Sequence, residues 1–433
     1  MSWKKVNLGD LCTIEKGKTG IQKAIPGEYP LVVTAEDRKS HNEYQFDDEA
    51  VIIPLVSGTG HGHASIKRLH FQSGKFALGT ILCAVIPKDK TVLNAEYLFR
   101  FLNLNKEREL VDRMKGMANV TLPIKEIAKI EIPLPSLEEQ MEFVKKYGLL
   151  ETDSEDISLE LTQQLDLIKQ LRQAFLREAM QGKLLTAVTS SAVEKQATGH
   201  ELLAKIKAEK AQLIAEKKLK KEKEFPPITA DEIPFEIPEH WAWCRLGEIC
   251  NYGSSPKSEP KDLNENTWVL DLEDIEKETS TLLNKIRFNE RNSLSTKSIF
   301  KKGQVLYSKL RPYLDKVIVA DEDGVCTTEI LPLKLYGNLN PYFTKFALKR
   351  SDFLIYVNSV TKGMKMPRLG TNDGQMALFP LPPLHEQEQI VAKLEELMAF
   401  CDGLEQSIKE SQGYNEMLLQ QVLREALQGE KKK

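Results

Sequence analysis

The sequence predicts two homologous domains of mixed α and β structure. Each is followed by a long α-helix, and the two helices are expected to pair as an antiparallel coiled coil about a pseudo-twofold axis. Two observations predict this fold class. Residues 133–140 (Pro-Leu-Pro-Ser-Leu-Glu-Glu-Gln) recur 247 positions later at 380–387 (Pro-Leu-Pro-Pro-Leu-His-Glu-Gln), and residues 176–182 recur at the same offset at 423–429. One inserted residue would rotate the rest of a helix by about 100°. An ungapped repeat of this length therefore indicates a helix of fixed length.

The repeat also covers the segments before each helix. Lys115-Gly116-Met117 matches Lys362-Gly363-Met364 at the offset of 247, whereas the N-terminal segment 3–12 matches 241–250 at an offset of 238. The second copy has therefore gained nine residues upstream of its Lys-Gly-Met element. These boundaries predict domains at residues 1–136 and 239–383, helices at 137–186 and 384–433, and a connector at 187–238.

The composition is consistent with this division. A chain of 433 residues is too long for one ordinary core and suits two domains of roughly 140 to 150 residues with helical connectors. No apolar run approaches the ~20 residues of a membrane span, and the N-terminus lacks the apolar core of a signal peptide. The net charge is −3, so a surface that binds nucleic acid must be local. The scattered cysteines, without a Cys-x-x-Cys pair, predict reduced core thiols at Cys12, Cys83, Cys244, Cys250, Cys326 and Cys401.

Each domain is predicted to contain short strands between turns and one helix that begins after an asparagine. In the first domain the expected strands are residues 29–34, 50–54, 80–86 and 127–132, and the helix is 95–113 after Asn94. In the second they are residues 267–270, 304–308, 316–320 and 330–335, and the helix is 341–356 after Asn340.

The long helices carry their own signals. Ser136 and Glu139 form a Ser-x-x-Glu capping box, so the first helix should begin there. Apolar residues then step by three and four, with polar residues in mid-stripe that would set the register of a helix pair at some cost in stability. The alternative is that each helix packs only on its own domain. The stripes are Leu161, Leu165, Ile168, Arg172, Phe175 and Ala179, and Leu404, Ile408, Gln412, Asn415, Leu419, Val422 and Ala426.

The connector is expected to contain a charged helix over residues 201–224, which the prolines at 226, 227, 234 and 238 would stop from continuing. Five lysines lie between Lys217 and Lys223. Such a run is most often a solvated helix end, and contact with phosphate is the alternative.

Three segments resemble catalytic motifs but lack a required part. The glycine-rich residues 57–63 are followed by no helix that could cradle a phosphate. His61 and His63 lack a third metal ligand nearby. Residues 340–343 (Asn-Pro-Tyr-Phe) lack the second proline of the Asn-Pro-Pro-Tyr motif of amino-methyltransferases. We therefore predict no catalytic residue, no metal and no cofactor in this chain.

Three elements combine basic residues with aromatic residues, serine or glycine in loops: residues 306–316, the matched loops 113–116 and 362–368, and the matched loops 16–19 and 254–257. Arginine and lysine can bridge guanine acceptors or neutralise phosphate, and tyrosine or serine can contact backbone oxygens. Basic loops are usually only solvated, but two of these elements recur in both halves. The candidate DNA-binding residues are Lys16, Lys18, Thr19, Arg113, Lys115, Ser255, Lys257, Tyr307, Ser308, Lys309, Arg311, Tyr313, Lys362, Lys365 and Arg368.

Four motifs together resemble the DNA-specificity subunit of type I restriction-modification systems over nearly the whole chain. They are Pro-Leu-Pro-x-Leu-x-Glu-Gln before each long helix, Trp-x-x-x-x-Leu-Gly-[Asp/Glu] at the start of each domain, Leu-Tyr-Ser-Lys-Leu-Arg-Pro-Tyr at 306–313, and Leu-Arg-Glu-Ala-x-Gln-Gly at the helix ends. Two departures stand out. The first copy has Ser136 where the second has Pro383, and residues 56–63 replace the Arg-Pro-Tyr turn in the first domain.

The resemblance implies two target recognition domains, each reading one half of a bipartite asymmetric site in double-stranded DNA. It also implies docking of two methyltransferase subunits and recruitment of restriction subunits. S-adenosylmethionine, ATP and Mg²⁺ would be used by these partners in the cytoplasm of a bacterium or archaeon, and none would be bound by this chain. Two other function classes stay open: an orphan DNA methyltransferase and a coiled-coil scaffold that does not bind DNA.

The repeat also predicts a molecular ruler. Residues 157–182 and 404–429 each span 26 residues, which corresponds to a rod of about 39 Å at ~1.5 Å per residue. One turn of B-DNA is ~34 Å, so the rod would hold the centres of the two half-sites about one turn apart. Half-sites of roughly three to five base pairs would then be separated by roughly six to eight unread base pairs. Four residues inserted near Lys169 should lengthen that spacer by about one or two base pairs.

Overall fold

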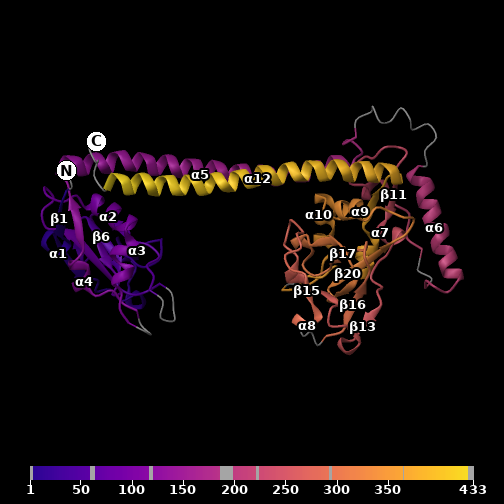
Figure 1. Ribbon diagram of the computed structural model, residues 1–433, viewed down its shortest axis with the longest axis horizontal. Helices are drawn as coiled ribbons and strands as arrows, with labels where there is room; N and C mark the ends of the chain where they lie inside the picture. Colours follow the sequence, from indigo (N-terminus) through magenta and orange to yellow (C-terminus); the bar gives the residue numbers. More distant parts are fainter. Residues whose placement is uncertain are drawn as a thin grey trace. The chain divides into compact units, whose positions relative to one another are not determined.

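The computed structural model describes residues 3–58, 64–116, 120–185, 198–220, 224–291, 295–363 and 365–427 (Figure 1). The chain divides into two compact units, one formed by Met1–Gln163 with Ile408–Lys433 and the other by Gln164–Ser407. Both boundaries fall inside long helices, so each unit contains one globular domain and a section of each helix. His61, His63, Met117 and Met364 lie outside the described residues, as do positions 186–197 and 221–223 of the connector.

The first globular domain combines a two-stranded sheet, β1-β10, with two four-stranded sheets in the orders β2-β9-β6-β7 and β4-β3-β8-β5. The strands are β1 (Lys4–Asn7), β2 (Cys12–Lys16), β3 (Tyr29–Val32), β4 (Lys39–His41), β5 (Phe46–Asp47), β6 (Ala50–Pro54), β7 (His70–Gln72), β8 (Lys75–Leu78), β9 (Leu82–Pro87) and β10 (Glu131–Leu134). The helices are α1 (Leu8–Leu11), η1 (Ile21–Lys23), α2 (Ala95–Leu104), α3 (Lys106–Glu109), η2 (Val111–Arg113) and α4 (Ile124–Ala128).

The second globular domain has a two-stranded sheet, β11-β21, a four-stranded sheet, β12-β20-β17-β18, and a five-stranded sheet, β13-β16-β19-β14-β15. The strands are β11 (Ala242–Arg245), β12 (Cys250–Asn251), β13 (Lys257–Ser258), β14 (Trp268–Leu270), β15 (Ile286–Arg287), β16 (Lys297–Phe300), β17 (Val305–Ser308), β18 (Val317–Val319), β19 (Gly324–Cys326), β20 (Ile330–Leu335) and β21 (Leu378–Leu381). The helices are α6 (Gly199–Ala215), η4 (Ala230–Glu232), α7 (Leu246–Ile249), η5 (Pro260–Asp262), η6 (Leu272–Asp274), α8 (Phe288–Arg291), η7 (Pro312–Leu314), α9 (Pro341–Leu348), α10 (Ser351–Val360) and α11 (Thr371–Met376).

The repeat seen in the sequence is also a repeat of topology. In each domain the first strand pairs antiparallel with the strand that precedes the long helix, β1 with β10 and β11 with β21. Each domain also contains a single described parallel pair, β3 with β8 and β14 with β19. The prediction of two homologous domains of mixed α and β structure is confirmed at this level.

The repeated Pro-Leu-Pro-x-Leu-x-Glu-Gln motif has a structural reason. Its final glutamine is fully buried in both copies, as Gln140 and Gln387. The Gln140 Oε1 accepts from the Asn94 backbone N–H at 2.8 Å, and the Gln387 Oε1 accepts from the Asn340 N–H at 3.0 Å. Their amide groups donate to carbonyls of their own motif, those of Pro135 and Pro382. The glutamine thus joins the start of each long helix to the residue before the domain helix.

That residue is itself the predicted N-cap. The Asn94 side chain accepts from the Tyr97 N–H at 2.9 Å, and the Asn340 side chain accepts from the N–H groups of Tyr342 and Phe343. At the long helix, Glu139 and Ser136 form the predicted capping box. A polar side chain at the N-cap supplies an acceptor for N–H groups that the helix leaves unpaired, so these three predictions are confirmed.

Replacing Gln387 with alanine is expected to lower the free energy of unfolding by about 2 to 3 kcal/mol, because it leaves a buried N–H and a buried carbonyl without partners. The neighbouring Glu388 is exposed and serves as the control, since Glu388→Ala should change stability little. Urea denaturation of both variants measures the difference. Equal midpoints would show that the motif is not held through its glutamine.

The two long helices are α5 (Leu137–Met180) and α12 (Leu384–Leu427), and each has 44 residues. The ruler was predicted from 26 residues and a length of about 39 Å. Each helix is longer, with a rise of ~66 Å, so the predicted length was wrong. In each helix, one set of half-buried or buried positions steps by four and three. They are Ser154, Ser158, Leu161, Leu165, Ile168, Arg172, Phe175 and Ala179 in α5, and Cys401, Glu405, Ile408, Gln412, Asn415, Leu419 and Val422 in α12.

Within each unit the two helices contact one another through the polar members of these stripes. In the first unit, the Asn415 amide donates to the Ser154 carbonyl at 2.9 Å and to the Ser158 hydroxyl at 3.0 Å. In the second, the Arg172 guanidinium donates to Asp402 at 2.7 Å and to Glu405 at 3.1 Å. Leu404, expected in the stripe, is instead 37% exposed.

Several expected elements differ from the structure. The connector helix, expected over residues 201–224, ends at Ala215, well before the prolines. The helix expected at 95–113 is broken at Asn105, and the one expected at 341–356 is broken at Lys349 and Arg350. The strand expected at 127–132 starts later, because residues 124–128 form the short helix α4. Ile127 remains buried, so its apolar character reflects the core and not a strand.

The connector helix α6 packs on the second domain, whereas the described lysines after it, Lys217, Lys218 and Lys220, are exposed, as predicted for a solvated helix end. Leu202 and Ile206 are buried on the second domain, and a Cβ added at Gly337, which has a φ of +64°, would lie 2.4 Å from Ile206. The Lys210 ammonium donates to the Gly247 carbonyl at 2.8 Å. The capping box of Thr198 with Glu201 starts the helix. The segment thus belongs to the second compact unit. All six cysteines are free and buried, as predicted.

Candidate nucleic-acid interface

The basic turn of the second domain connects the ends of β17 and β18 and lies against a hairpin at residues 362–368. The Arg311 N–H donates to the Pro367 carbonyl at 2.7 Å, and the Leu369 N–H donates to the Lys309 carbonyl at 2.9 Å. Lys362 and Arg368 pair across the hairpin. The structure therefore brings two separate predicted elements together. The residues gathered there are Lys309, Arg311, Tyr313, Lys362, Lys365 and Arg368.

The side chains of this group are partly available to solvent. Tyr313 is 50% exposed, and Lys362, Lys365 and Arg368 are exposed. Arg311 is half-buried, and its guanidinium lies within 3.4 Å of the Lys365 carbonyl. Arg368 already pairs with Glu329 at 3.1 Å, so its charge is partly neutralised.

Two candidate residues of this turn lie in the interior. Tyr307 and Ser308 are each 3% exposed, which differs from the prediction that they contact DNA. The Tyr307 ring packs edge-on to Phe353, and burial raises its pKa well above the ordinary value. The Ser308 hydroxyl donates to the Leu310 carbonyl at 2.9 Å. Both residues belong to β17, all four residues of which are buried, so the strand is covered on both faces.

The first domain contains the same arrangement of backbone. The Ser57 N–H donates to the Val120 carbonyl at 2.9 Å, and the Leu122 N–H donates to the Leu55 carbonyl at 2.9 Å. Lys115 and Thr121 pair across the hairpin, as Lys362 and Arg368 do in the second domain. The loop after β6 thus occupies the place of the Arg-Pro-Tyr turn, and Ser57 stands where the second domain has Arg311.

The candidate residues of the first hairpin are already paired with acidic side chains. Arg113 donates to Glu109 at 3.2 Å, and the Lys115 ammonium lies 3.1 Å from Glu126. Lys115 is nevertheless 65% exposed. Sequence reasoning did not identify Ser57 or Thr121 as interface residues. Thr121 corresponds to Arg368 at the repeat offset of 247, and the backbone pairing shows that Ser57 corresponds to Arg311.

The remaining candidates lie at other strand ends and loops. Lys16 ends β2, and Lys18 and Thr19 follow it. The Lys18 N–H and the Lys16 carbonyl are both held by the Gln45 amide. The Thr19 N–H donates to the Leu78 carbonyl at 3.1 Å. In the second domain, Ser255 is half-buried and the Lys257 ammonium donates to the Ser298 hydroxyl at 3.0 Å. The structure does not link this third element to the turn and hairpin.

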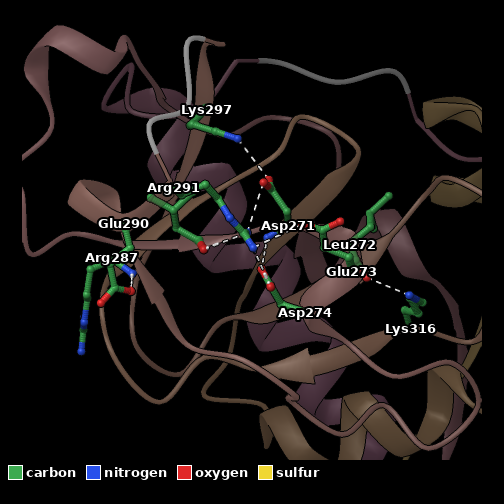
Figure 2. A network of polar contacts seen from close by, with 10 residues as sticks. Asp271, Leu272, Glu273, Asp274, Arg287, Glu290, Arg291, Lys297 and Lys316 are labelled. Atoms are coloured by element: carbon green, nitrogen blue, oxygen red, sulfur yellow. Dashed lines mark hydrogen bonds and ion pairs between the residues drawn. The ribbon is translucent and has the colours of Figure 1, made fainter. Parts of the chain in front are cut away.

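A buried ion-pair network lies beside the basic turn (Figure 2). Asp274 is fully buried and accepts from both terminal nitrogens of Arg291, at 2.5 and 2.7 Å. Asp271 accepts from Lys297 at 3.0 Å. Lys316, at the end of the turn, donates to the Leu272 carbonyl at 2.7 Å and so joins the turn to this network.

The chemistry of the combined site is that of binding. It presents cations and one exposed phenol, which suit phosphate and base-edge acceptors. Over the described ranges, no cluster of three or more His, Cys, Asp or Glu side chains is placed to hold a metal ion. No helix within those same ranges is long and apolar enough to cross a membrane.

A family model described as the type I restriction modification DNA specificity domain matches residues 1–165 and 238–411, which is more than half of the chain. The chain belongs to this type I restriction-modification specificity family. Both matched segments contain one globular domain and the start of the long helix that follows it. The specificity subunit thus carries two copies of the family domain, which agrees with the internal repeat.

Its relatives and structural neighbours bear similar names. The EcoDI specificity subunit of Escherichia coli is 28% identical over 431 residues, covering 99% of this chain and 89% of the relative. The Escherichia coli EcoAI specificity subunit is 30% identical over 256 residues, 55% of this chain and 41% of that protein.

Two solved structures share the fold of this specificity subunit. One is a chain from a type I R-M system, with a TM-score of 0.63, 17% identity and coverage of 99% of this chain and 98% of the neighbour. The other is the HsdS subunit of Thermoanaerobacter tengcongensis, with a TM-score of 0.50, 17% identity and coverage of 99% and 97%. At this identity the likeness shows the fold alone.

Proposed function

We propose that each globular domain of this specificity subunit reads one half of a bipartite, asymmetric DNA site through its turn and hairpin. One observation supports this most strongly. The two domains share the backbone arrangement but carry different side chains on it, Ser57 and Thr121 in the first domain and Arg311 and Arg368 in the second. An arginine can bridge two acceptors of guanine, whereas a serine or threonine hydroxyl cannot. Two different half-sites are therefore expected.

We further infer that α5 and α12 pair as an antiparallel coiled coil with pseudo-twofold symmetry. Asn415 contacts Ser158 in the first unit and Arg172 contacts Asp402 in the second. The positions on α12 therefore fall as those on α5 rise, which is the pattern of an antiparallel pair. Combined with the repeat offset of 247, this pairing would place the symmetry axis near residues 163 and 410.

The pairing predicts a specific cross-link. Cysteines replacing Ser158 and Asn415 should form a disulfide readily under mild oxidation, because the Asn415 amide nitrogen lies 3.0 Å from the Ser158 hydroxyl oxygen. A control pair that shifts one partner by two residues, S158C with M417C, should cross-link poorly, since Met417 is 59% exposed. Gel mobility after oxidation distinguishes them. Efficient cross-linking of the control, or none of the predicted pair, would contradict this register.

We also propose that two methyltransferase subunits dock on the helices and that restriction subunits join through them. Exposed apolar residues recur at the repeat offset: Ile157 (47%) corresponds to Leu404 (37%), and Leu167 (60%) corresponds to Tyr414 (64%). Exposed apolar side chains grouped on a charged surface favour a protein partner. Their repetition suits two copies of the same partner.

In this proposal the chain itself is non-catalytic, and S-adenosylmethionine, ATP and Mg²⁺ belong to the partners. The experiment is reconstitution with the methyltransferase subunit. Site-specific methylation is expected only when both are present, and equilibrium dialysis should detect no labelled S-adenosylmethionine on the chain alone. Cofactor binding by the isolated chain would favour the orphan methyltransferase. A complex without sequence selectivity would favour the scaffold.

A further inference from the structure

A buried lysine lies at the break between α9 and α10. Lys349 is 8% exposed, and its ammonium reaches three groups from two different turns. It donates to the Asp315 carboxylate at 2.7 Å, to the Glu278 carbonyl at 2.7 Å and to the Ser280 hydroxyl at 2.9 Å. It also lies 3.4 Å from the Asp315 carbonyl. Asp315 lies in the C-terminal half of the basic turn, so Lys349 holds that turn from inside the domain.

The basic turn and the segment around residues 278–280 are also joined directly by hydrogen bonds. The Ser280 hydroxyl donates to the Asp315 carbonyl at 2.7 Å and accepts from the Val317 N–H at 3.1 Å. The Glu278 N–H donates to the Leu314 carbonyl at 2.9 Å. The segment around residues 278–280 therefore fixes the C-terminal half of the basic turn, and Lys349 fixes both segments together.

Unfavourable backbone conformations gather at this place. Arg311, Asp315, Glu278 and Ser280 all have left-handed φ values, of 50°, 48°, 65° and 59°. They are four of the six described residues other than glycine with positive φ. Such conformations persist only where the surroundings enforce them, and they concentrate at functional sites. The Lys349 ammonium contacts three of these four residues, Glu278, Ser280 and Asp315.

The ion pair is poorly suited to a purely stabilising role. Burial raises the pKa of Asp315 to about 6, and burial lowers the pKa of Lys349 below its ordinary value. Both shifts disfavour the charged forms, so desolvation outweighs the attraction between the partners. Buried ion pairs of this kind are often replaceable by neutral side chains without loss of stability. A role in fixing the conformation of the turn accounts for the pair better.

The first long helix, α5, contacts the same cluster. The Gln173 amide of α5 lies 3.4 Å from the Lys349 carbonyl, and the Lys169 ammonium lies 4.0 Å from the Glu278 carboxylate. All four residues belong to the second compact unit. The helix that leaves the first domain therefore contacts the residues that hold the turn of the second domain.

We propose that Lys349 is a positioning residue for the reading of the second half-site: held against α5, it locks the Arg311–Asp315 turn in the left-handed conformation that presents Arg311 and Tyr313. This inference rests on the proposed function. Lys349 touches no DNA itself. It acts through the turn, so its loss should affect discrimination between base sequences in one half-site more than it affects assembly or overall charge.

The test uses the full chain reconstituted with the methyltransferase subunit, with the neutral double variant K349M/D315N, since asparagine tolerates left-handed backbone. DNA duplexes altered in one half-site at a time measure discrimination. We expect the ratio of cognate to altered second half-site to fall about tenfold, a size typical of losing one base contact. Discrimination at the first half-site and the salt dependence of binding should stay as in the parent.

Two further variants keep the test decisive. S280G removes the hydroxyl that joins the two segments and leaves the ion pair in place. A smaller loss of discrimination, at the second half-site alone, is expected. R245M removes a buried arginine that contacts Glu232, away from the turn, and should leave both half-sites unchanged. If the melting temperature shows that K349M/D315N does not fold, discrimination by S280G at the second half-site tests the positioning role instead.

Unchanged discrimination at the second half-site in a folded K349M/D315N, or equal loss at both half-sites, would overturn the positioning role. Failure of the proposed function has a different signature, because the parent complex would then show no discrimination at the second half-site.

Discussion

Four residues inserted between Gln163 and Gln164, together with four between Ser407 and Ile408, are expected to lengthen the DNA spacer by about one or two base pairs. The insertion adds ~6 Å and a little over one helical turn to each helix, so the paired stripes stay nearly in phase. Each base pair of B-DNA adds about 3.4 Å along the duplex. Both half-site sequences should stay as they were, because neither domain is altered.

The position of the insertion follows from the structure. Both points fall at the boundary between the compact units, so the contacts of each unit are left intact. An insertion near Lys169 would instead disturb its approach to Glu278. The spacer length of six to eight base pairs was predicted from a helix of 26 residues. Because the helices are longer than this, that length is no longer predicted. Only the change in spacer is therefore predicted.

Methylation of plasmids that carry the two half-sites at varied separation measures the preferred spacer. Alanine substitutions at Gln163 and Ser407, without any insertion, serve as the control and should keep the parental spacing. If the insertion variant methylates only the original spacing, the helices do not set the separation of the half-sites.

Arg311→Ala is expected to weaken binding of the cognate second half-site by about 1–3 kcal/mol and to relax specificity at one base position. Its backbone is fixed in the left-handed conformation and its side chain lies against the hairpin, so its direction is well defined. A contact with phosphate would behave differently. It would weaken binding to all sequences evenly and lower the salt slope by about one.

Lys309→Ala and Lys365→Ala provide the matched comparison, since Lys365 is exposed on the hairpin and Lys309 is half-buried beside it. All three substitutions should affect the second half-site only. Fluorescence anisotropy with duplexes altered one base pair at a time separates the two kinds of contact. Unchanged affinity in all three variants would remove this turn and hairpin from the DNA interface.

Much of the architecture was predictable because it depends on local signals. The side-chain caps at Asn94 and Asn340 satisfy N–H groups a few residues away, and the capping box of Ser136 does the same. The strands β6 and β20 coincide with the apolar segments 50–54 and 330–335. The repeat offset identified the equivalent domains without any structural knowledge.

The features that fix the candidate site depend on contacts between distant segments. Nothing near Lys349 is a glycine or proline that would signal a helix break, and its partners lie 34 and more positions away. Left-handed backbone at Arg311 could not be anticipated, since non-glycine residues seldom adopt it. The burial of Tyr307 depends on side chains from distant segments, such as Phe353, that pack on β17, and the local pattern does not predict such contacts.

The equivalence of Ser57 and Arg311 shows the same limit. The two loops share no sequence motif, and residues 59–63 of the first loop lie outside the described part of the chain. The repeat places residues 56–63 opposite the Arg-Pro-Tyr turn, but the residue-by-residue match of Ser57 with Arg311 comes from the hydrogen bonds to Val120 and Pro367. A motif search therefore locates the recognition turn in one domain and misses it in the other.

The central claim is that two domains with the same scaffold and different side chains read two different half-sites. Sequencing the methylated bases in a host that carries this chain and its methyltransferase subunit tests it most directly. The expected motif is bipartite and asymmetric, with two unlike half-sites separated by unread base pairs, and Arg311→Ala should relax one of those half-sites alone. A single continuous motif, a palindrome, or relaxation of both half-sites by that substitution would contradict the account.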